Sequence, residues 1–471
     1  MTTDANSAVS QPTAPAPTDP AAIPPELPLP QERIDLGRKQ RGQAPRSAHA
    51  KWEPAKDRPD PVALLEASNK SRLQELVPIR YGRMLASPFT YLRGSPIVMA
   101  HDLATTPTTG FRVQLCGDCH LMNFGLYASP ERNLLFDIND FDETLPGPWE
   151  WDLKRLVVSF AVAARARSLR DRDGKEAART CARSYRERMR EYSTMSLLDV
   201  WYSRVDAAAA SRVFDRAARK PLADQIDKAW HHNQMQALSK LTVVEDDKLK
   251  IATLPPLIQR VERDDLKDLL RRLFRGYFAS LQDDRRALIE RYRFMDFALK
   301  VVGVGSVGTR CYIVLLDAGH NADSLLLQVK EAQASILEPF AGKSAYHNHG
   351  RRVVAGQRLM QSASDIFLGW SNEDEHDCYF RQLRDMKGSA DLEAMTPPDL
   401  IEYAELCGWV LARAHARSGD AARIAGYLGK GGVFDDAAAD FAIAYADQND
   451  RDYETLRAAA RSGRIAVETG V

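Results

Sequence analysis

Two short polar segments near the N-terminal end of the chain restrict what this sequence can fold into more than any other feature. Residues 116–125 read Cys-Gly-Asp-Cys-His-Leu-Met-Asn-Phe-Gly, so that Asp118 is followed five residues later by Asn123. Residues 136–143 contain the triplet Asp140-Phe-Asp142. An Asp, an Asn and a further Asp after a short strand is the order of a proton acceptor and metal ligands in phosphoryl-transfer sites.

The residue types suit that chemistry. Asp118 is the predicted catalytic carboxylate, which orients an acceptor hydroxyl and takes its proton. Asn123 and Asp140 supply oxygen ligands for Mg²⁺, and Asp142 can ligate a second ion. Asp137 ends the same predicted strand and competes with Asp140, which we favour because it begins the Asp-Phe-Asp triplet. Any one of these residues alone could simply cap a turn; their order favours the functional interpretation.

A second candidate segment lies far along the chain. Residues 303–308 read Gly-Val-Gly-Ser-Val-Gly and stand between β-like runs at 297–304 and 311–316. Such a turn is typical of loops that cover nucleotide phosphates, although a plain hairpin can also carry it. The predicted strand at 324–330 ends in Lys330, which suits contact with the α- and β-phosphates. The predicted cofactor-binding residues are Gly303, Gly305, Ser306, Gly308 and Lys330.

The acidic partner of that lysine is not fixed by the sequence. Glu331 is adjacent to Lys330, and Glu338 begins the following segment. The predicted helix at 351–363 contains no acid. Both glutamates therefore stay candidates.

Composition argues against several classes of protein. Lys plus Arg and Asp plus Glu each number 64, so the net charge is near zero, which gives no support to a nucleic-acid or membrane-surface role. The first basic residue is Arg33, and every apolar run is too short to span a bilayer. The six cysteines are mostly scattered. We therefore expect a cytoplasmic protein with reduced thiols.

The order of patterns predicts an α+β fold in four parts. Residues 1–45 form a Pro/Ala-rich tail that cannot bury a core and should be disordered. Residues 46–293 form a helical catalytic lobe, 294–388 a small β-rich nucleotide-binding lobe, and 389–471 a helical segment that completes the catalytic lobe. The stretch at 170–293 is predicted to be almost entirely helical. The predicted helices are 64–84, 96–103, 151–169, 351–363, 400–416 and 435–461, and the strands are 112–115, 124–127, 134–138, 297–304, 311–316, 324–330, 366–370 and 378–383.

Residues 116–120 also match Cys-x-x-Cys-His, the attachment sequence of c-type haem. That interpretation requires export and leaves Asn123 and Asp140 unexplained, so we disfavour it. A redox pair or half of a zinc site stays open, but no second Cys or His pair lies at a suitable spacing.

Several segments together resemble the uncharacterised bacterial family catalogued as domain of unknown function 2252. They cover nearly everything after the tail: residues 87–94, 116–125, 136–156, 303–310, 328–332 and 378–389. The motifs are also similar to those of protein-kinase-like and aminoglycoside-phosphotransferase-like enzymes, which implies ATP and Mg²⁺ as cofactors. In those enzymes the Gly-rich loop and the lysine precede the catalytic loop, whereas here they follow it. The resemblance therefore implies a two-lobed kinase-like fold in circularly permuted order.

The same resemblance implies two supporting residues. Asp152 follows Trp151 at the start of a predicted helix and matches an aspartate that braces the catalytic loop. Residues 411–416, Leu-Ala-Arg-Ala-His-Ala, resemble the helix that leads into that loop and include His415.

The resulting hypothesis is an ATP- and Mg²⁺-dependent phosphotransferase that acts on an unidentified hydroxyl of a small molecule or a protein. AMP transfer on the same fold and a nucleotide-binding pseudokinase are the alternatives, and the presence of Asp118 argues against the second. We expect Asp118 and Lys330 to face one cleft. The oligomeric state is not predicted.

Overall fold

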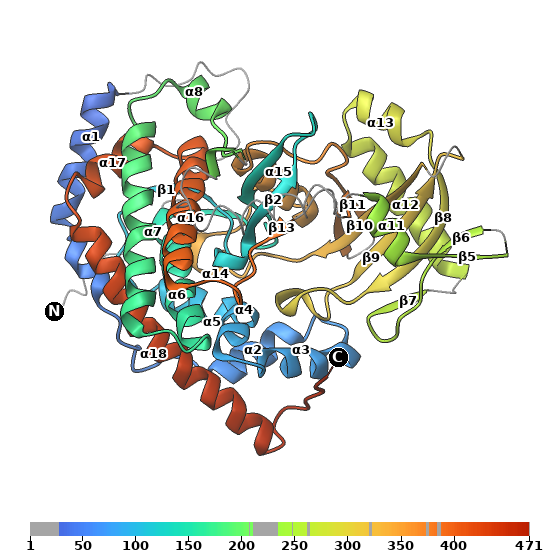
Figure 1. The fold of residues 1–471 in the computed structure, drawn as a ribbon, viewed down its shortest axis with the longest axis horizontal. Coiled ribbons are helices and arrows are strands. Elements are labelled where there is room, and N and C mark those ends of the chain that lie inside the picture. Colours follow the sequence, from blue (N-terminus) through green and yellow to red (C-terminus); the bar gives the residue numbers. More distant parts are fainter. Residues whose placement is uncertain are drawn as a thin grey trace, which may run out of the picture.

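The computed structural model describes residues 28–470, apart from 207, 211–233, 247, 261–263, 320–322, 374–375 and 384–387. The fold is α+β: a large group of helices lies on one side and a six-stranded antiparallel sheet on the other (Figure 1). None of the helices in the described ranges is long and apolar enough to cross a membrane.

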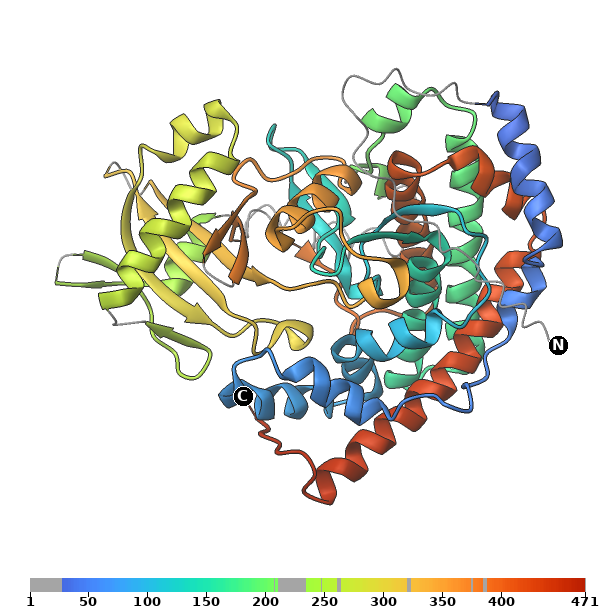
Figure 2. The ribbon, with the colours of Figure 1, turned by 180° about the vertical axis from the view of Figure 1, so that it is seen from behind.

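The N-terminal segment is more ordered than its composition predicts. Helix α1 (Pro30–Lys39) lies within the stretch 1–45 that we expected to be disordered, and that expectation is wrong for these residues. Residues 1–27 lie outside the described part of the chain. Helix α1 packs so closely on α17 (Ala421–Leu428) that a Cβ on Gly37 would collide with the carbonyl oxygen of Arg423 (Figure 2). Contact with a distant helix therefore orders this segment.

Four short helices follow, each with a proline in its first turn, where the missing amide costs nothing. They are α2 (Pro61–Asn69), α3 (Val77–Met84), α4 (Pro88–Gly94) and α5 (Pro96–Leu103). The continuous helix predicted at 64–84 is wrong in its middle. The chain leaves the helix at residues 70–73, where the amide of Leu73 donates to the carbonyl of Gly308 at 2.8 Å.

The hairpin predicted between the Asp118 and Asp140 loops is confirmed. Strand β2 (Phe124–Ala128) pairs with β3 (Leu134–Ile138), and β13 (Gly388–Ser389) pairs with β2. Strand β1 (Arg112–Leu115) precedes the first loop and pairs antiparallel with β4 (Leu145–Pro148), which follows the second. This pairing holds both loops at one end of the same two-stranded sheet.

The helical group is built on α6 (Trp149–Ala166), α7 (Asp171–Tyr192), α16 (Pro397–Ser418) and α18 (Val433–Arg461). These helices confirm the predictions at 151–169, 400–416 and 435–461. The short helix α8 (Leu197–Tyr202) follows α7. Helix α6 is buried at every residue from Trp149 to Ala164. Its polar residues Asp152 and Arg155 must therefore find partners inside the protein.

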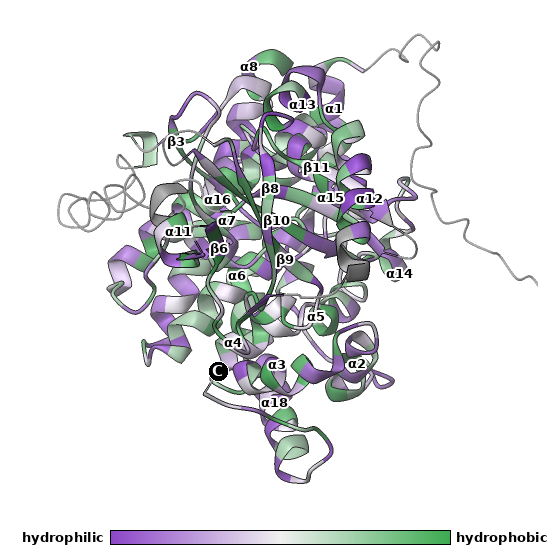
Figure 3. Cartoon of the chain, turned by 90° about the vertical axis from the view of Figure 1, so that its right-hand side faces the viewer, coloured by the Kyte–Doolittle hydropathy of each residue, from purple (hydrophilic) through white to green (hydrophobic). Residues whose placement is uncertain are grey.

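The six-stranded sheet has the order β11-β12-β10-β9-β8-β7. Its strands are β7 (Ile258–Arg260), β8 (Arg293–Lys300), β9 (Cys311–Asp317), β10 (Ser324–Ala332), β11 (Gly369–Glu373) and β12 (His376–Gln382). The strands at the middle of this sheet are predominantly hydrophobic (Figure 3). In β10, Leu327 and Val329 pack with α12 (Asp264–Ser280), whereas Gln328 and Lys330 line a cavity on the opposite face.

Three predictions for the sheet are wrong. The strand predicted at 297–304 corresponds to β8, which begins and ends four residues earlier. The stretch at 170–293 is not all helical, because β5 (Thr242–Glu245), β6 (Lys248–Ile251) and β7 lie between α11 (Gln234–Leu241) and α12. The sheet therefore begins before residue 294. The strand predicted at 366–370 begins at Gly369, because the preceding residues turn, with the amide of Leu368 donating to the carbonyl of Asp365.

Three further helices complete the described part of the fold. They are α13 (Asp283–Ile289), α14 (Glu338–Ala341) and α15 (His349–Met360). The last confirms the helix predicted at 351–363. Helix α15 contacts β10, β11 and β12, and it also reaches α16, so it bridges the sheet and the helical group.

Candidate functional site

A cavity of about 190 Å³ lies where the Asp118 and Asp140 loops meet the sheet. Its walls come from α2 to α5, from both loops, from the Gly-rich segment and from β10 and β12. The predicted site residues that line it are Asp118, Asn123, Asp140, Asp142, Gly303, Gly305, Ser306 and Lys330. Asp118 and Lys330 therefore do face one cavity. Gly308 is not among its lining residues.

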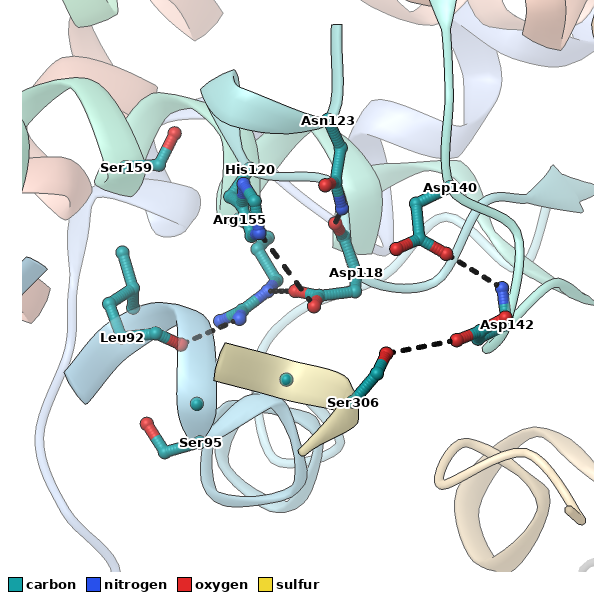
Figure 4. A network of polar contacts seen from close by, with 12 residues as sticks. Leu92, Ser95, Asp118, His120, Asn123, Asp140, Asp142, Arg155, Ser159 and Ser306 are labelled. Carbon is teal, nitrogen blue, oxygen red and sulfur yellow. Dashed lines mark hydrogen bonds and ion pairs between the residues drawn. The ribbon is translucent and has the colours of Figure 1, made fainter. Parts of the chain in front are cut away.

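Asp118 is held by a buried arginine of α6. The Nε of Arg155 donates to Asp118 Oδ1 at 2.6 Å, and the same guanidinium donates to the carbonyl of Leu92 at 2.8 Å (Figure 4). Burial raises the pKa of Asp118; Arg155 opposes this rise, and the Asp140 carboxylate adds to it. A raised pKa suits a carboxylate that must accept a proton.

Asp152 stabilises the loop that carries Asp118 by accepting hydrogen bonds from its backbone. The Asp152 carboxylate accepts the backbone amides of Cys116 and Gly117 at 2.8 and 3.0 Å. On its other side it meets Nε2 of His415 at 3.3 Å, and His415 Nδ1 meets the hydroxyl of Tyr185 at 2.9 Å. The bracing contact expected of Asp152 is thus present, and His415, near the end of α16, contacts Asp152.

The residues predicted to hold metal differ in how free their oxygens are. Asn123 donates its amide to the carbonyl of Asp118 at 2.6 Å, which leaves its side-chain oxygen for a ligand. Asp140 accepts only the amide of Asp142, at 3.2 Å, among the contacts within the described ranges (Figure 4). These two oxygens fit Mg²⁺, which typically takes one or two protein ligands together with substrate phosphates.

The carboxylate of Asp142 makes more contacts within the protein than the prediction assumed. One of its oxygens forms an ion pair with Lys330, and the other accepts the hydroxyl of Tyr379 at 2.7 Å. Ser306 Oγ lies 3.4 Å from the first oxygen. Burial raises the pKa of Asp142, but Lys330, Tyr379 and Arg381 together outweigh burial and lower the pKa overall. Oδ1 of Asp142 accepts only the Tyr379 hydroxyl among the contacts in the described ranges, so it keeps a lone pair for a metal.

Asp137, the alternative to Asp140 as a metal ligand, has protein donors on both carboxylate oxygens. It is completely buried, and its two oxygens lie 2.7 and 2.9 Å from a guanidinium nitrogen of Arg413. The amide and hydroxyl of Ser362 also donate to it, both at 2.9 Å. With its carboxylate filled by protein donors, Asp137 is not a metal ligand, which supports the choice of Asp140.

Neither glutamate proposed as the partner of Lys330 makes that contact. Glu331 pairs with Arg310 at 3.2 Å, and Glu338 lies 4.0 Å from His349. The counter-ion of Lys330 is Asp142 instead. Burial lowers the pKa of Lys330, but the charges of Asp142, Tyr379 and Asp140 together outweigh burial, so the pKa lies above its usual range.

The Gly-rich segment is a loop between β8 and β9 with one short turn, Val304–Ser306. Arg72 donates to the carbonyls of Gly305 and Val307 at 3.0 and 2.7 Å, and Arg83 donates to that of Val302 at 2.7 Å. Gly308 has a φ of 87°, which an L side chain rarely adopts. The loop is therefore fastened to the N-terminal helices, a contact that the sequence did not predict.

Sequence reasoning missed the arginines of the cavity and one acid. Arg72, Arg80, Arg93 and Arg381 all line it, as does Glu143. Burial raises the pKa of Glu143 to about 7, against the pull of Arg352. The arginines stand outside the predicted catalytic and phosphate-binding motifs. Their only signal was that Arg93 and Arg381 fall within segments used for the family resemblance.

The two cysteines of the Cys-x-x-Cys-His string lie close to Asp152. Cys116, Cys119 and Asp152 have ligand atoms within 4.8 Å of one another and form the one such group of His, Cys, Asp and Glu found in the described ranges. Burial raises the pKa of both thiols, that of Cys119 to about 12. Asp152 already accepts two amides and both cysteines are buried, which disfavours a metal or a haem at this position.

Helix α16 ends directly beside the strand that leads into the Asp118 loop. The amide of Gln114 in β1 donates to Ser418 Oγ at 3.0 Å. A Cβ on Gly419 would lie 2.5 Å from a methyl of Val113 and 3.2 Å from the carbonyl of Arg112. The end of α16 and the start of the loop are thus neighbours in space, although they lie at opposite ends of the sequence.

Comparison with known proteins gives one result. No curated protein and no solved structure matches the chain. A family model described as uncharacterised protein conserved in bacteria, DUF2252, matches residues 72–459. That range includes both loops, the Gly-rich segment, Lys330 and α16. The chain therefore belongs to this bacterial family, domain of unknown function 2252.

Proposed function

We propose that the protein is an ATP- and Mg²⁺-dependent phosphotransferase with a circularly permuted kinase-like arrangement. One observation carries the proposal: a candidate base, two candidate metal ligands, a buried lysine and a glycine-rich turn, from separate parts of the sequence, line the same cavity. Phosphoryl transfer requires these parts and little more from a protein.

The order of elements supports the permuted arrangement. The Gly-rich turn joins the first two strands of the meander β8-β9-β10, Lys330 lies on the third, and helix α15 follows before β11. In kinases the phosphate-binding lysine also lies on the third strand and is followed by a helix. The proximity of Ser418 to Gln114 supplies the point at which a chain in the usual order would pass from α16 into the Asp118 loop.

In the proposed reaction Asp118 takes the proton of the acceptor hydroxyl. The acceptor oxygen forms a bond to the γ-phosphorus of ATP, and the bond from that phosphorus to the bridging oxygen of ADP breaks. Arg155 holds Asp118 in place for this step. Mg²⁺, when held by Asn123 and Asp140, neutralises charge on the phosphates. Lys330 supplies a second positive charge beside them.

The size of the cavity fits the phosphate end of a nucleotide. Sites that enclose whole drug-sized ligands measure about 300–1,000 Å³, against about 190 Å³ here. The charged residues around the cavity suit phosphates rather than a base. We therefore propose that the nucleoside lies outside it. The free and buried state of all six cysteines fits the cytoplasmic location that we propose.

Nucleotide binding is the first test. At a hundredfold excess over the dissociation constant, ATP with Mg²⁺ should raise the free energy of unfolding by about 2–3 kcal/mol. Omitting Mg²⁺ or introducing Asp140→Asn should reduce that gain. No gain with any nucleotide, for folded protein, would exclude both the enzyme and a nucleotide-binding pseudokinase.

Turnover is the second test. Purified protein is incubated with a metabolite mixture and ATP labelled at either the α- or the γ-phosphate, and the products are identified by mass spectrometry. Transfer of the γ label with release of ADP is expected. Transfer of the α label would show AMP transfer instead, and nucleotide binding without any transfer would favour a pseudokinase.

A further inference from the structure

Four arginines line the cavity, and three of them donate hydrogen bonds to acceptors within the protein. Arg72 holds the carbonyls of the Gly-rich loop. Arg80 donates to Asn69 Oδ1 and to the carbonyl of Gly94, both at 2.6 Å. Arg381 donates to Gln328 Oε1 at 2.8 Å.

Arg93 differs from these three. Across the described ranges its guanidinium makes no hydrogen bond and no ion pair, and its Nε is buried without a partner. Burial lowers the pKa of Arg93, and the charges that oppose this are Asp118 and Asp140. The free guanidinium thus shares the cavity with the candidate base and a candidate metal ligand.

The backbone on both sides of Arg93 is held in place. The carbonyl of Leu92 accepts from Arg155 at 2.8 Å, and that of Gly94 accepts from Arg80 at 2.6 Å. Arg155 is also the residue that holds Asp118 (Figure 4). One buried guanidinium therefore fixes the candidate base and the helix end that carries Arg93. A Cβ on Gly305 would lie 3.4 Å from the carbonyl of Arg93, so the tip of the Gly-rich loop is adjacent.

A guanidinium whose Nε is buried without a partner is costly unless an anion fills the space beside it. Lys330 does not have this freedom, because Asp142 already neutralises it. Arginine is also suited to the trigonal oxygens of a phosphoryl group, because its planar fork presents several donors at once.

We infer that Arg93 is a catalytic residue that donates to the transferring phosphoryl group and stabilises the charge on its oxygens. The inference rests on the phosphotransferase function proposed above. While the γ-phosphorus leaves the bridging oxygen of ADP and bonds to the acceptor oxygen, Asp118 takes the acceptor's proton and Arg93 contacts the oxygens of the group in transit. ADP itself lacks that group, so Arg93 contributes little to binding ADP.

The test compares the wild type with Arg93→Met and Arg93→Lys, and Arg190→Met, at an exposed position of α7, is the matched control. Binding of Mg·ADP is measured by calorimetry, with and without aluminium fluoride as a mimic of the transferring group. Release of phosphate from ATP to water is measured in the same proteins, and circular dichroism checks that each is folded. Phosphate release should fall about 10³-fold or more in Arg93→Met, as expected for an arginine that acts on this group.

The binding data decide the assignment even where turnover is slow. Arg93→Met should bind Mg·ADP as the wild type does but lose the tightening caused by aluminium fluoride, whereas Arg93→Lys should keep part of it and Arg190→Met all of it. Equal tightening in wild type and Arg93→Met would overturn the role of Arg93 and leave the phosphotransferase standing. A parallel loss of ADP affinity would also overturn it, because Arg93 would then bind the nucleotide generally. Absence of Mg·ADP binding in the wild type would remove the proposed function and this inference together.

Discussion

The helical and sheet sides of the cavity are supported in different ways. On the helical side, Asp118 and its loop are held by Arg155 and Asp152, both on the buried helix α6. On the sheet side, Lys330 and the Gly-rich loop are held by groups from across the cavity, Asp142 and Arg72. The helical side therefore carries its own support, whereas the sheet side depends on contacts with the Asp140 loop and the N-terminal segment. A rigidly held candidate base fits the group transfer proposed above.

The largest expected effect tests the chemistry of the helical side. Asp118→Asn is nearly isosteric and can still accept from Arg155, so folding and nucleotide affinity should persist. ATP turnover should fall roughly 10²- to 10⁴-fold, the usual contribution of a positioned base. ADP and AMP release are measured separately in wild type and variant.

Asp137→Asn is the matched control, because it makes the same change at a buried aspartate outside the cavity. It should lower the free energy of unfolding by weakening the contact with Arg413, with little change in turnover per folded molecule. Wild-type turnover in Asp118→Asn would show that the helical side does not hold the base.

The next largest effect tests whether the two sides depend on each other through one ion pair. Removing one partner of a buried pair costs about 3–5 kcal/mol, so Lys330→Met and Asp142→Asn should each destabilise the protein by about that amount. Because each single change leaves the other charge unpaired, the double variant should lose less than the sum of both losses. Urea unfolding of the four proteins gives the coupling energy. Strict additivity would mean that the pair does not join the two sides.

The same contrast explains what the sequence could predict. The geometry of residues 116–143 depends on local contacts. The strands on either side pair with each other, and the proximity of Asp118, Asn123 and Asp140 follows from that pairing. The choice of Asp140 over Asp137 came from the triplet alone, and the Arg413 contact supports it. The strands of β8 to β10 were visible for the same local reason.

What the sequence could not predict depends on distant segments. Lys330 took Asp142 as its partner rather than a nearby glutamate, because the sheet faces the Asp140 loop and no local pattern encodes that. Helix α1 is ordered by α17, and the loop at residues 70–73 is shaped by Gly308. Arg93 has no distinctive local signal, since its unused donors become apparent only once the cavity around it is formed.

A smaller effect is expected from the brace of the Asp118 loop. In Asp152→Asn the amide group of the new side chain cannot accept, so one of the two backbone amides of Cys116 and Gly117 loses its partner. A hydrogen bond to a charged group contributes about 1.5–3 kcal/mol, and the free energy of unfolding should fall by that amount. Hydrogen exchange at those two amides should accelerate, while amides of the Gly-rich loop keep their wild-type rates. Faster exchange on the sheet side as well would mean that the helical side is not supported independently.

The smallest effect concerns the pH dependence of the helical group, through His49. Its ring is completely buried, and Nε2 meets the hydroxyl of Tyr427 at 2.8 Å. Burial, helped by Lys154, lowers the pKa of His49 from 6.5 to about 3. Between those two pH values the unfolded chain binds a proton at His49 that the folded chain does not, so the contribution of His49 to stability falls as the pH drops below 6.5 and is constant above it. The slope of the unfolding free energy against pH should be steeper in the wild type than in His49→Gln, which cannot titrate, by up to about 1.4 kcal/mol per pH unit.

Urea unfolding at pH 5, 6, 7 and 8, followed by a probe on each side of the cavity, measures this difference. If the helical group is stable independently of the sheet, the extra pH dependence should appear in the unfolding transition reported by the helical probe. Equal slopes of unfolding free energy against pH in wild type and His49→Gln would show that the histidine is not buried in the neutral form.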